Sequence, residues 1–191
     1  MRKIIFATNN QHKTQEVQQL LDGQYEVLSL KDIHCDADIE ETGSTFAANA
    51  ELKARYVVDH FQMDCFADDS GLEVDALNGE PGIYSARYSG KRDDRENLKL
   101  VLQKLEGASN RRARFKTVVA LVRNGQTELF EGVIEGTIRK APSGDGGFGY
   151  DPIFQPDGYD ITFAEMSMAE KNSISHRALA MKKLISFLQA Q

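Results

Sequence analysis

Residues 113–139, ARFKTVVALVRNGQTELFEGVIEGTIR, carry the pattern of a long β-hairpin. Two runs with alternating apolar residues, 113–123 and 127–139, flank the dipeptide Asn124-Gly125. Such alternation is typical of strands with one buried face, and Asn-Gly favours the tight turn that joins two antiparallel strands. The stretch therefore predicts two long antiparallel strands within one sheet.

Another strand is predicted near the start of the chain. Residues 3–7 are apolar enough for a buried strand, and a polar turn follows at residues 8–12. Val17, Leu20 and Leu21 then recur at helical spacing. The first part of the chain is therefore predicted to be a strand, a loop and a helix.

The remaining elements complete an α/β pattern. Strands mixed with helices, together with one hairpin, predict an α/β fold with a mixed central β-sheet flanked by helices. No repeat, linker or low-complexity tract interrupts residues 1–191, so we expect a single domain, with two lobes about a cleft. The other expected helices start at Ser44 or Thr45, Asp93 and Ser175, and the other expected strands are 64–67 and 72–77.

Composition narrows the possible functions. The chain has 191 residues, of which 27% are charged, and a formal net charge of −6 at pH 7. Binding along a nucleic-acid backbone needs a broad excess of Lys and Arg, so we expect no nucleic-acid partner. The apolar run at residues 4–6 is too short for a signal peptide, and we expect a cytoplasmic protein without a membrane span. Cys35 and Cys65 lack metal-site spacing, so we expect neither a zinc site nor a disulfide framework.

A polar loop lies between the first strand and the first helix. Free backbone N–H groups and the helix dipole attract anions at such a position. Lys13 falls in the first helical turn, where a cation opposes the dipole unless an anionic ligand neutralises it. The glycines of a P-loop are absent, and an ordinary solvated helix start explains the segment equally well. The candidate anion-binding residues are Thr8, Asn9, Asn10, Gln11, His12 and Lys13.

Two adjacent carboxylates, Asp68 and Asp69, follow an apolar stretch and precede Ser70-Gly71. We expect them in a tight turn at the end of a strand, where like charges are costly unless a cation separates them. Carboxylates beside a phosphate-binding surface commonly hold Mg²⁺, and Glu40-Glu41 could supply a further ligand. A solvated turn explains the aspartates equally well, and a solvated acidic loop explains the glutamates better.

Lys53 is predicted to share a helix face with an apolar stripe. It falls seven residues after Phe46 and three residues after Ala50. An ammonium group at this position either lies along the edge of the stripe, which is the commoner arrangement, or meets an anion.

Two later segments are further candidates for ligand binding. Residues 143–152 contain four glycines around Phe148, so both backbone and ring could approach a ligand closely, although a flexible connector is the alternative. Lys171 and Ser175-His176-Arg177 place polar groups at or just before the first turn of the last helix. A helix cap followed by surface charges explains that second segment as well. No serine elbow accompanies His176, which argues against a nucleophilic triad.

Six motifs occur in a fixed order along nearly the whole chain. They are Thr8-Asn9-Asn10 with Lys13 and Glu16, Glu40-Glu41-Thr42-Gly43 with Thr45-Phe46, Ala67-Asp68-Asp69-Ser70-Gly71-Leu72, Pro81-Gly82-Ile83-Tyr84-Ser85-Ala86-Arg87-Tyr88, Gly147-Phe148-Gly149-Tyr150-Asp151-Pro152 and Ser175-His176-Arg177. This set closely resembles the inosine triphosphate pyrophosphatase family, also described as non-canonical purine nucleoside triphosphate pyrophosphatases. Any single motif could arise by chance, whereas six in order are highly specific. The one departure is Asn9, where many family members have glycine.

The resemblance implies a homodimer, dependence on Mg²⁺ and a nucleotide bound in the cleft between two lobes. It implies that Asp69 is the catalytic base and a metal ligand, that Glu40 is the second acidic metal ligand, and that Ser70 contacts substrate. Residues 8–13 then bind the triphosphate. The residues implied in holding the base and its neighbouring groups are Phe148, Gly149, Tyr150, Asp151, Lys171, His176 and Arg177.

The predicted reaction is hydrolysis of ITP, dITP or XTP to the nucleoside monophosphate and pyrophosphate. Lys13, Lys53 and Mg²⁺ would absorb charge, while Asp69 orients a metal-associated water for in-line attack on the α-phosphorus. Hypoxanthine and xanthine carry an acceptor at the 6-position, where adenine carries an amino donor. We therefore expect donors from Arg177 and nearby backbone to select against ATP.

Two alternatives remain open. One is a related pyrophosphatase that acts on modified pyrimidine nucleotides, which a panel of substrates would distinguish. The other is a nucleotide-binding sensor without turnover, which release of pyrophosphate with Mg²⁺ would exclude. Asp68-Asp69 and Glu40 disfavour the sensor, because a sensor needs no catalytic base.

Overall fold

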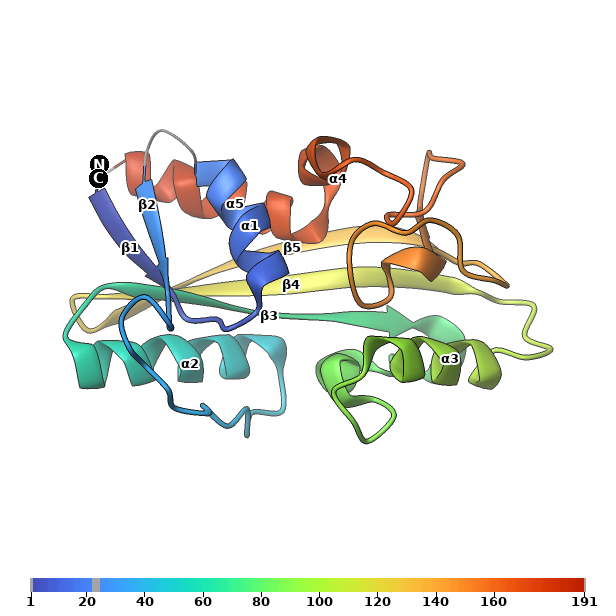
Figure 1. Ribbon diagram of the computed structural model, residues 1–191, viewed down its shortest axis with the longest axis horizontal. Helices are drawn as coiled ribbons and strands as arrows, with labels where there is room; N and C mark the ends of the chain where they lie inside the picture. The colour runs from blue at the N-terminus through green and yellow to red at the C-terminus, as the bar shows by residue number, and fades with distance from the viewer. Residues whose placement is uncertain (1, 22–24, 191) are drawn as a thin grey trace. The chain divides into compact units, whose positions relative to one another are not determined.

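The computed structural model describes residues 2–21 and 25–190, which form a six-stranded mixed sheet with helices (Figure 1). The order of strands in the sheet is β2-β1-β3-β4-β5-β6. β1 runs parallel to both β2 and β3, whereas β5 and β6 are antiparallel. The predicted α/β fold with a mixed central sheet is therefore confirmed. The strands are β1 Arg2–Phe6, β2 Tyr25–Ser29, β3 Cys65–Val74, β4 Arg112–Arg123, β5 Gln126–Ile138 and β6 Phe154–Pro156.

Helices lie in the connections between the first four strands and also follow the last strand. None of them, within the two described ranges, is long and apolar enough to cross a lipid bilayer. The α-helices are α1 Gln11–Leu21, α2 Phe46–Phe61, α3 Asp94–Lys104, α4 Met168–Ile174 and α5 His176–Gln189. The short 3₁₀-helices are η1 Asp75–Leu77, η2 Gly82–Arg87 and η3 Asp151–Ile153.

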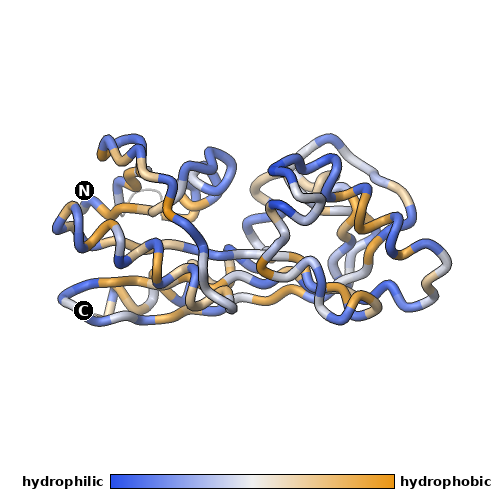
Figure 2. The backbone as a smooth tube through the Cα atoms, turned by 90° about the horizontal axis from the view of Figure 1, so that it is seen from below, coloured by the Kyte–Doolittle hydropathy of each residue, from blue (hydrophilic) through white to orange (hydrophobic). Residues whose placement is uncertain are grey.

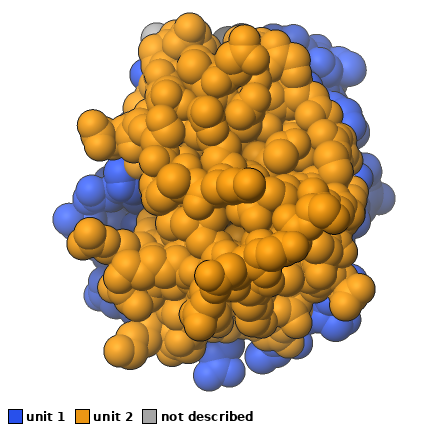
Figure 3. Space-filling model, turned by 90° about the vertical axis from the view of Figure 1, so that its right-hand side faces the viewer, with its two compact units in different colours: residues 1–69, 117–132, 177–191 blue, residues 70–116, 133–176 orange. Residues whose placement is uncertain are grey.

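The chain forms two compact units, which Figure 3 draws in different colours. Unit 1 comprises residues 1–69, 117–132 and 177–191. Unit 2 comprises residues 70–116 and 133–176. Each unit has buried apolar clusters of its own.

Unit 1 has three layers, with the sheet between helices. Successive residues of a strand point to opposite faces, so Phe6 and Ile5 in β1 enter different clusters. The Phe6 cluster contains Val17 of α1 and Leu184 of α5, and the Ile5 cluster contains Val57 of α2. Figure 1 shows the same arrangement, with α1 and α5 on one side of the sheet and α2 on the other.

Unit 2 encloses a separate core rich in aromatic residues. Leu72 of β3 and Phe115 of β4 pack there with Val101 of α3. The ring of Phe115 also contacts the rings of Phe154 and Phe163, with centroids 4.6 and 5.8 Å away. In Figure 2, hydrophobic residues recur along the strands and helices, whereas most of the turns between them are hydrophilic.

Local sequence signals account for several element boundaries. The side chain of Thr45 caps α2 by accepting the N–H of Ala48, and that of Asp93 caps α3 by accepting the N–H of Glu96. Asn124-Gly125 joins β4 to β5 with positive φ at both residues, 52° and 75°, as the predicted hairpin turn requires. These predicted caps and the predicted hairpin are confirmed.

Two predictions about secondary structure were wrong. Residues 64–67 and 72–77 were expected as separate strands around a turn, but Asp68 and Asp69 lie inside one continuous strand, β3. Cations from other parts of the chain neutralise the charge that was expected to break the strand. The chain also forms α4, which the sequence patterns did not indicate, and Lys171 belongs to this helix rather than to the approach to α5. A capping box between Ser167 and Glu170 starts α4.

Candidate active site

The strand β3 separates its two adjacent carboxylates onto opposite faces of the sheet. Phe66 belongs to the cluster under α1 and α5, whereas Ala67 belongs to the cluster under α2. The period of two residues then directs Asp68 towards α1 and α5, and Asp69 towards α2. Their hydrogen-bond partners agree with this assignment, because Lys13 lies in α1 and Asn49 lies in α2. Like charges adjacent in sequence are therefore kept apart.

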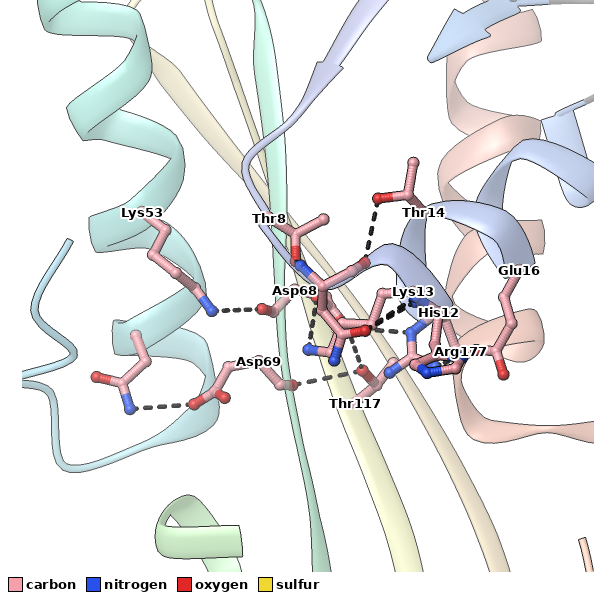
Figure 4. A network of polar contacts seen from close by, with 12 residues as sticks. Thr8, His12, Lys13, Thr14, Glu16, Lys53, Asp68, Asp69, Thr117 and Arg177 are labelled. Carbon is pink, nitrogen blue, oxygen red and sulfur yellow. Dashed lines mark hydrogen bonds and ion pairs between the residues drawn. The ribbon is translucent and has the colours of Figure 1, made fainter. Parts of the chain in front are cut away.

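Asp68 is the centre of a buried network of ion pairs (Figure 4). Its Oδ1 lies 2.9 Å from Nζ of Lys13 and its Oδ2 lies 3.1 Å from Nε of Arg177. Burial by itself raises the pKa of Asp68, but the charges of Lys13, Arg177 and Lys53 outweigh it and hold the pKa below its ordinary value. Asp68 therefore remains ionised and pairs with the side chains of Lys13 and Arg177, which makes it unsuitable as a proton acceptor.

Arg177 is shared between two carboxylates. Its Nη1 pairs with Oε2 of Glu16 in α1, while its Nε donates to Asp68. The side chain of Arg177 is 2% exposed. Sequence reasoning placed Arg177 at the first turn of the last helix, which is confirmed, but it did not identify Glu16 as the partner.

Asp69 has the properties of a general base. It is 6% exposed, and its Oδ2 accepts a hydrogen bond of 3.0 Å from Nδ2 of Asn49. Burial raises the pKa of Asp69 to about 6, against the opposing charge of Lys53 and with the additional help of the Glu41 charge. A carboxylate with a pKa near neutrality accepts a proton more readily than an ordinary surface aspartate.

Lys53 meets an anion instead of lying along the apolar stripe. Its Nζ lies 2.5 Å from Oε1 of Glu41 and 2.7 Å from the main-chain oxygen of Asp68. Figure 4 shows Lys53 reaching from α2 to β3. The acidic loop therefore contributes Glu41 to the contact with Lys53, whereas the side chain of Glu40, which the family resemblance implied as a metal ligand, is exposed to solvent. No sequence pattern distinguishes the two neighbouring glutamates.

The polar loop before α1 is ordered by its own side chains. Oδ1 of Asn10 accepts the N–H groups of His12 and Lys13 at 3.0 and 3.3 Å, and Oγ1 of Thr8 accepts the N–H of Asn10 at 3.1 Å. The predicted helix start is confirmed, with Lys13 in the first turn. Asn9, Gln11 and His12 are exposed, while Thr8, Asn10 and Lys13 are half-buried.

In unit 2, the glycine-rich loop is ordered around a buried ion pair. Nζ of Lys171 lies 2.7 Å from Oδ2 of Asp151 and 4.8 Å from the centroid of the Phe148 ring. The same Oδ2 accepts the N–H of Phe148 at 3.0 Å. A Cβ at Gly147 would lie only 2.1 Å from that oxygen, so only glycine fits there. These contacts exclude the alternative of a flexible connector.

Further hydrogen bonds hold the same loop within unit 2. The N–H of Gly149 donates to Oδ2 of Asp94 at 2.9 Å, and the hydroxyl of Tyr150 donates to the main-chain oxygen of Ser85 at 2.6 Å. The ring of His176 stacks on Phe115 with centroids 4.8 Å apart. The predicted residues Phe148, Asp151 and Lys171 are thus in contact, with Gly149 and Tyr150 in the same loop, while Ser70 lies in β3 with a half-buried side chain.

The carboxylates beside α2 suit a magnesium ion. Among residues 2–21 and 25–190 no cluster of three or more His, Cys, Asp or Glu side chains could hold a metal by itself. Mg²⁺ does not need such a cluster, because one or two carboxylates usually hold it together with waters and substrate phosphates. Asp69 and Glu41 provide two carboxylates, close enough for the charge of one to raise the pKa of the other. This donor set fits Mg²⁺.

Known proteins are similar to this chain in sequence and fold. The sequence profile of the Ham1 family matches residues 4–187. The dITP/XTP pyrophosphatase of Christiangramia forsetii is 50% identical to this chain, over 97% of the chain and 98% of that protein. The dITP/XTP pyrophosphatase of Flavobacterium psychrophilum is also 50% identical, over 98% of the chain and 99% of that protein.

Solved structures agree with these sequence matches. A HAM1 protein from Coxiella burnetii superposes with a TM-score of 0.91 at 42% identity and covers 100% of both chains. The Ham1 protein of Staphylococcus aureus superposes with a TM-score of 0.89 at 42% identity and covers 99% of both chains. The agreement of profile, relatives and fold over nearly the full length means that the chain belongs to the Ham1 family.

Proposed function

We propose that this chain hydrolyses non-canonical purine nucleoside triphosphates, including dITP, ITP and XTP, to the monophosphate and pyrophosphate with Mg²⁺. The observation that carries the proposal is Asp69, a buried carboxylate with a pKa of about 6 in a region rich in lysine and arginine. The names of the relatives at 50% identity support the substrate class. We also propose that the chain acts in the cytoplasm as a homodimer. Residues 1–191 would then form one catalytic domain.

The residues of unit 1 bind the triphosphate and activate water. Lys13 and Lys53 attract the phosphate oxygens, and the positive end of the α1 helix dipole favours an anion at the same place. Burial lowers the pKa of Lys13, although its partner Asp68 opposes this, so an anionic phosphate is a favourable second partner for Lys13. Asp69 accepts the proton of the attacking water. Mg²⁺ held by Asp69 and Glu41 would neutralise developing charge on the phosphates.

We assign the second acidic ligand to Glu41 instead of Glu40. Glu41 is held by Lys53 and its charge acts on Asp69. Exchanging Glu41 for Gln should therefore weaken Mg²⁺ binding more than the same exchange at Glu40.

The residues of unit 2 bind the base and its neighbouring groups. Phe148 offers a ring for stacking, and Lys171 with Asp151 fixes the loop that carries this ring. Arg177 of unit 1 reads the 6-oxo group as a charged donor. The proposed substrate contacts also include Ser70, Gly149, Tyr150 and His176, with Asn9, Gln11 and His12 in the loop before α1.

The direct test is release of pyrophosphate from a panel of nucleotides. ITP, dITP, XTP, ATP, GTP and modified pyrimidine triphosphates are incubated with the purified chain and Mg²⁺. The proposal requires pyrophosphate and monophosphate from the first three, with little product from ATP. A preference for modified pyrimidines would support the related pyrophosphatase, and binding without turnover would support a sensor.

Exchanging Lys13 or Lys53 for Met should weaken binding of the triphosphate. We expect Lys13→Met and Lys53→Met to raise KM for ITP by about 10- to 100-fold, because each removes a charged hydrogen-bond donor. Inhibition by IMP, which lacks the β- and γ-phosphates, should change much less. An equal loss of affinity for the monophosphate and the triphosphate would indicate that the lysine has a structural role.

The pKa of Asp69 predicts the pH dependence. Since the base must be deprotonated, kcat/KM for ITP is expected to fall about tenfold per pH unit below about pH 6. Protons compete with the cation for the same carboxylate, so a higher Mg²⁺ concentration should move this acid limb to lower pH. A flat profile between pH 7 and pH 5 would contradict the role of Asp69 as base.

A further inference from the structure

We infer that Asn49 is a positioning residue for the divalent cation, because its side chain connects Asp69 to the loop that carries Glu41. The inference rests on the proposed function, in which those two carboxylates hold the cation. Asn49 lies in the first part of α2, and its side chain is fully buried at 0% exposure. A buried amide must use both its donor and its acceptor, so its partners are informative.

Both ends of the Asn49 amide are occupied. Nδ2 donates to Oδ2 of Asp69 at 3.0 Å, and Oδ1 accepts the main-chain N–H of Gly43 at 2.7 Å. A main-chain N–H only donates and an ionised carboxylate only accepts, so these two partners fix the orientation of the amide. A Cβ at Gly43 would lie 2.7 Å from both Oδ1 of Asn49 and Cβ of Ala48. The acidic loop is therefore packed directly against α2 at this point.

Lys53 makes a second bridge between the same two segments. It follows Asn49 by four residues, so both side chains leave α2 on the same face. Lys53 contacts Glu41 in the loop and the main-chain oxygen of Asp68 in β3. The two bridges hold the loop and the strand at adjacent points. Lys53 has a charge with which to bind phosphate, whereas Asn49 is neutral and enclosed, which leaves orientation as its contribution.

Orientation matters because a carboxylate binds a cation well only in a narrow range of directions. Hydrogen bonds that orient metal-ligating groups typically account for 10- to 100-fold in metal affinity. Loss of the Asn49 amide would remove a hydrogen bond that orients the Asp69 carboxylate and would weaken the attachment of the acidic loop at Gly43. Both ligands would then need to be ordered again when the cation binds.

The chain provides a closely matched control in unit 2. Asn97 is the fourth residue of α3, as Asn49 is of α2, and it is 1% exposed. Its Oδ1 accepts a main-chain N–H, that of Ser89, at 2.7 Å, and its Nδ2 donates to the main-chain oxygen of Ala86 at 3.1 Å. Asn97→Ala thus removes the same group from an equivalent helix position without touching a carboxylate.

The test measures binding of Mn²⁺, added alone as a probe of the magnesium site, to the full chain by electron paramagnetic resonance. We expect Asn49→Ala to weaken Mn²⁺ binding by about 10- to 100-fold. Asn97→Ala should leave it unchanged even if both variants unfold at lower temperature. Should Asn49→Ala fail to fold, Asn49→Ser gives the same comparison. Wild-type Mn²⁺ affinity in the Asn49 variant, or an equal loss in both variants, would overturn the inference.

Hydrolysis of ITP gives an independent readout. Asn49→Ala should need a higher Mg²⁺ concentration for half-maximal rate and should recover much of its kcat when Mg²⁺ is saturating. Asn97→Ala should show the wild-type Mg²⁺ dependence. A loss of kcat in Asn49→Ala that no Mg²⁺ concentration relieves would contradict positioning of the cation site.

A variant of Asp69 separates failure of the inference from failure of the proposed site. Asp69→Asn should remove most Mn²⁺ binding, and adding Asn49→Ala to it should have a smaller further effect than Asn49→Ala has alone, because one of the two carboxylates that Asn49 positions is already lost. If Asp69→Asn binds Mn²⁺ normally, the proposed cation site is wrong. If Asp69→Asn loses Mn²⁺ while Asn49→Ala retains it, the site stands and only the role of Asn49 is refuted.

Discussion

Replacing Asp69 by Asn is expected to lower kcat for ITP by about 100- to 10,000-fold, the usual contribution of general acid–base catalysis. The exchange preserves the size of the side chain, and an amide oxygen still accepts the hydrogen bond from Nδ2 of Asn49. What is lost is the proton acceptor and a charged ligand for the cation. Pyrophosphate release under saturating ITP and Mg²⁺ measures the effect, and near-normal turnover would remove Asp69 from the mechanism.

Thermal unfolding serves as the control for the Asp69 variant. Burial raises the folded-state pKa of Asp69 to about 6 from an ordinary value of 3.8, so the folded protein binds this proton more tightly than the unfolded chain. The contribution of Asp69 to stability therefore decreases as pH rises through the window from about 4 to about 6. At pH 7 the ionised carboxylate opposes folding, and neutral Asn should give an equal or higher Tm. An inactive variant with a much lower Tm would instead point to loss of the fold.

Features set by neighbouring residues could be predicted from the sequence. The turn at Asn124-Gly125 follows from its need for positive φ, and the caps at Thr45 and Asp93 follow from side chains that accept N–H groups a few residues later. The periods of apolar residues identified the hairpin and the first helix. All these signals act over a few positions, so they can be read without knowledge of the tertiary fold.

The continuous strand through Asp68 and Asp69 could not be predicted in this way. Two adjacent acids suggest a turn, and only cations that are distant in sequence make a strand acceptable there. Lys13 lies 55 positions before Asp68 and Arg177 lies 109 positions after it. Their pairing depends on α1 and α5 packing on the same side of the sheet, which no local pattern specifies.

Which of Glu40 and Glu41 contacts Lys53 could not be predicted from the sequence for a related reason. The acidic loop has no regular period that would assign a direction to each side chain. Its course is set where Asn49 binds the N–H of Gly43 and where Lys53 binds Glu41. Asn49 and Lys53 are four residues apart, which places both on the same face of α2.

Exchanging Arg177 for Ala is expected to have two separable effects, the first of which is on stability. The exchange leaves Glu16 and Asp68 buried without the guanidinium that pairs with both. Removing one partner from a buried ion pair typically costs about 3–5 kcal/mol. Chemical denaturation should therefore show a large loss in the free energy of unfolding. A loss below about 1 kcal/mol would mean that these pairs contribute as little as exposed ones do.

The second effect of Arg177→Ala is on selectivity, measured under conditions in which the variant is fully folded. If the guanidinium also donates to the 6-oxo group, kcat/KM should fall about 10- to 100-fold more for ITP than for ATP, as for a hydrogen bond to a charged group. Phe148→Ala is the matched comparison, because stacking does not sense the 6-substituent and both nucleotides should lose equally. If the guanidinium acts only through Glu16 and Asp68, kcat/KM should likewise fall equally for ITP and ATP. Asp68 holds Lys13, which contacts the triphosphate that both nucleotides carry. An unchanged ratio of ITP to ATP in Arg177→Ala would therefore assign base recognition to other donors, with the N–H groups of the glycine-rich loop as the next candidates.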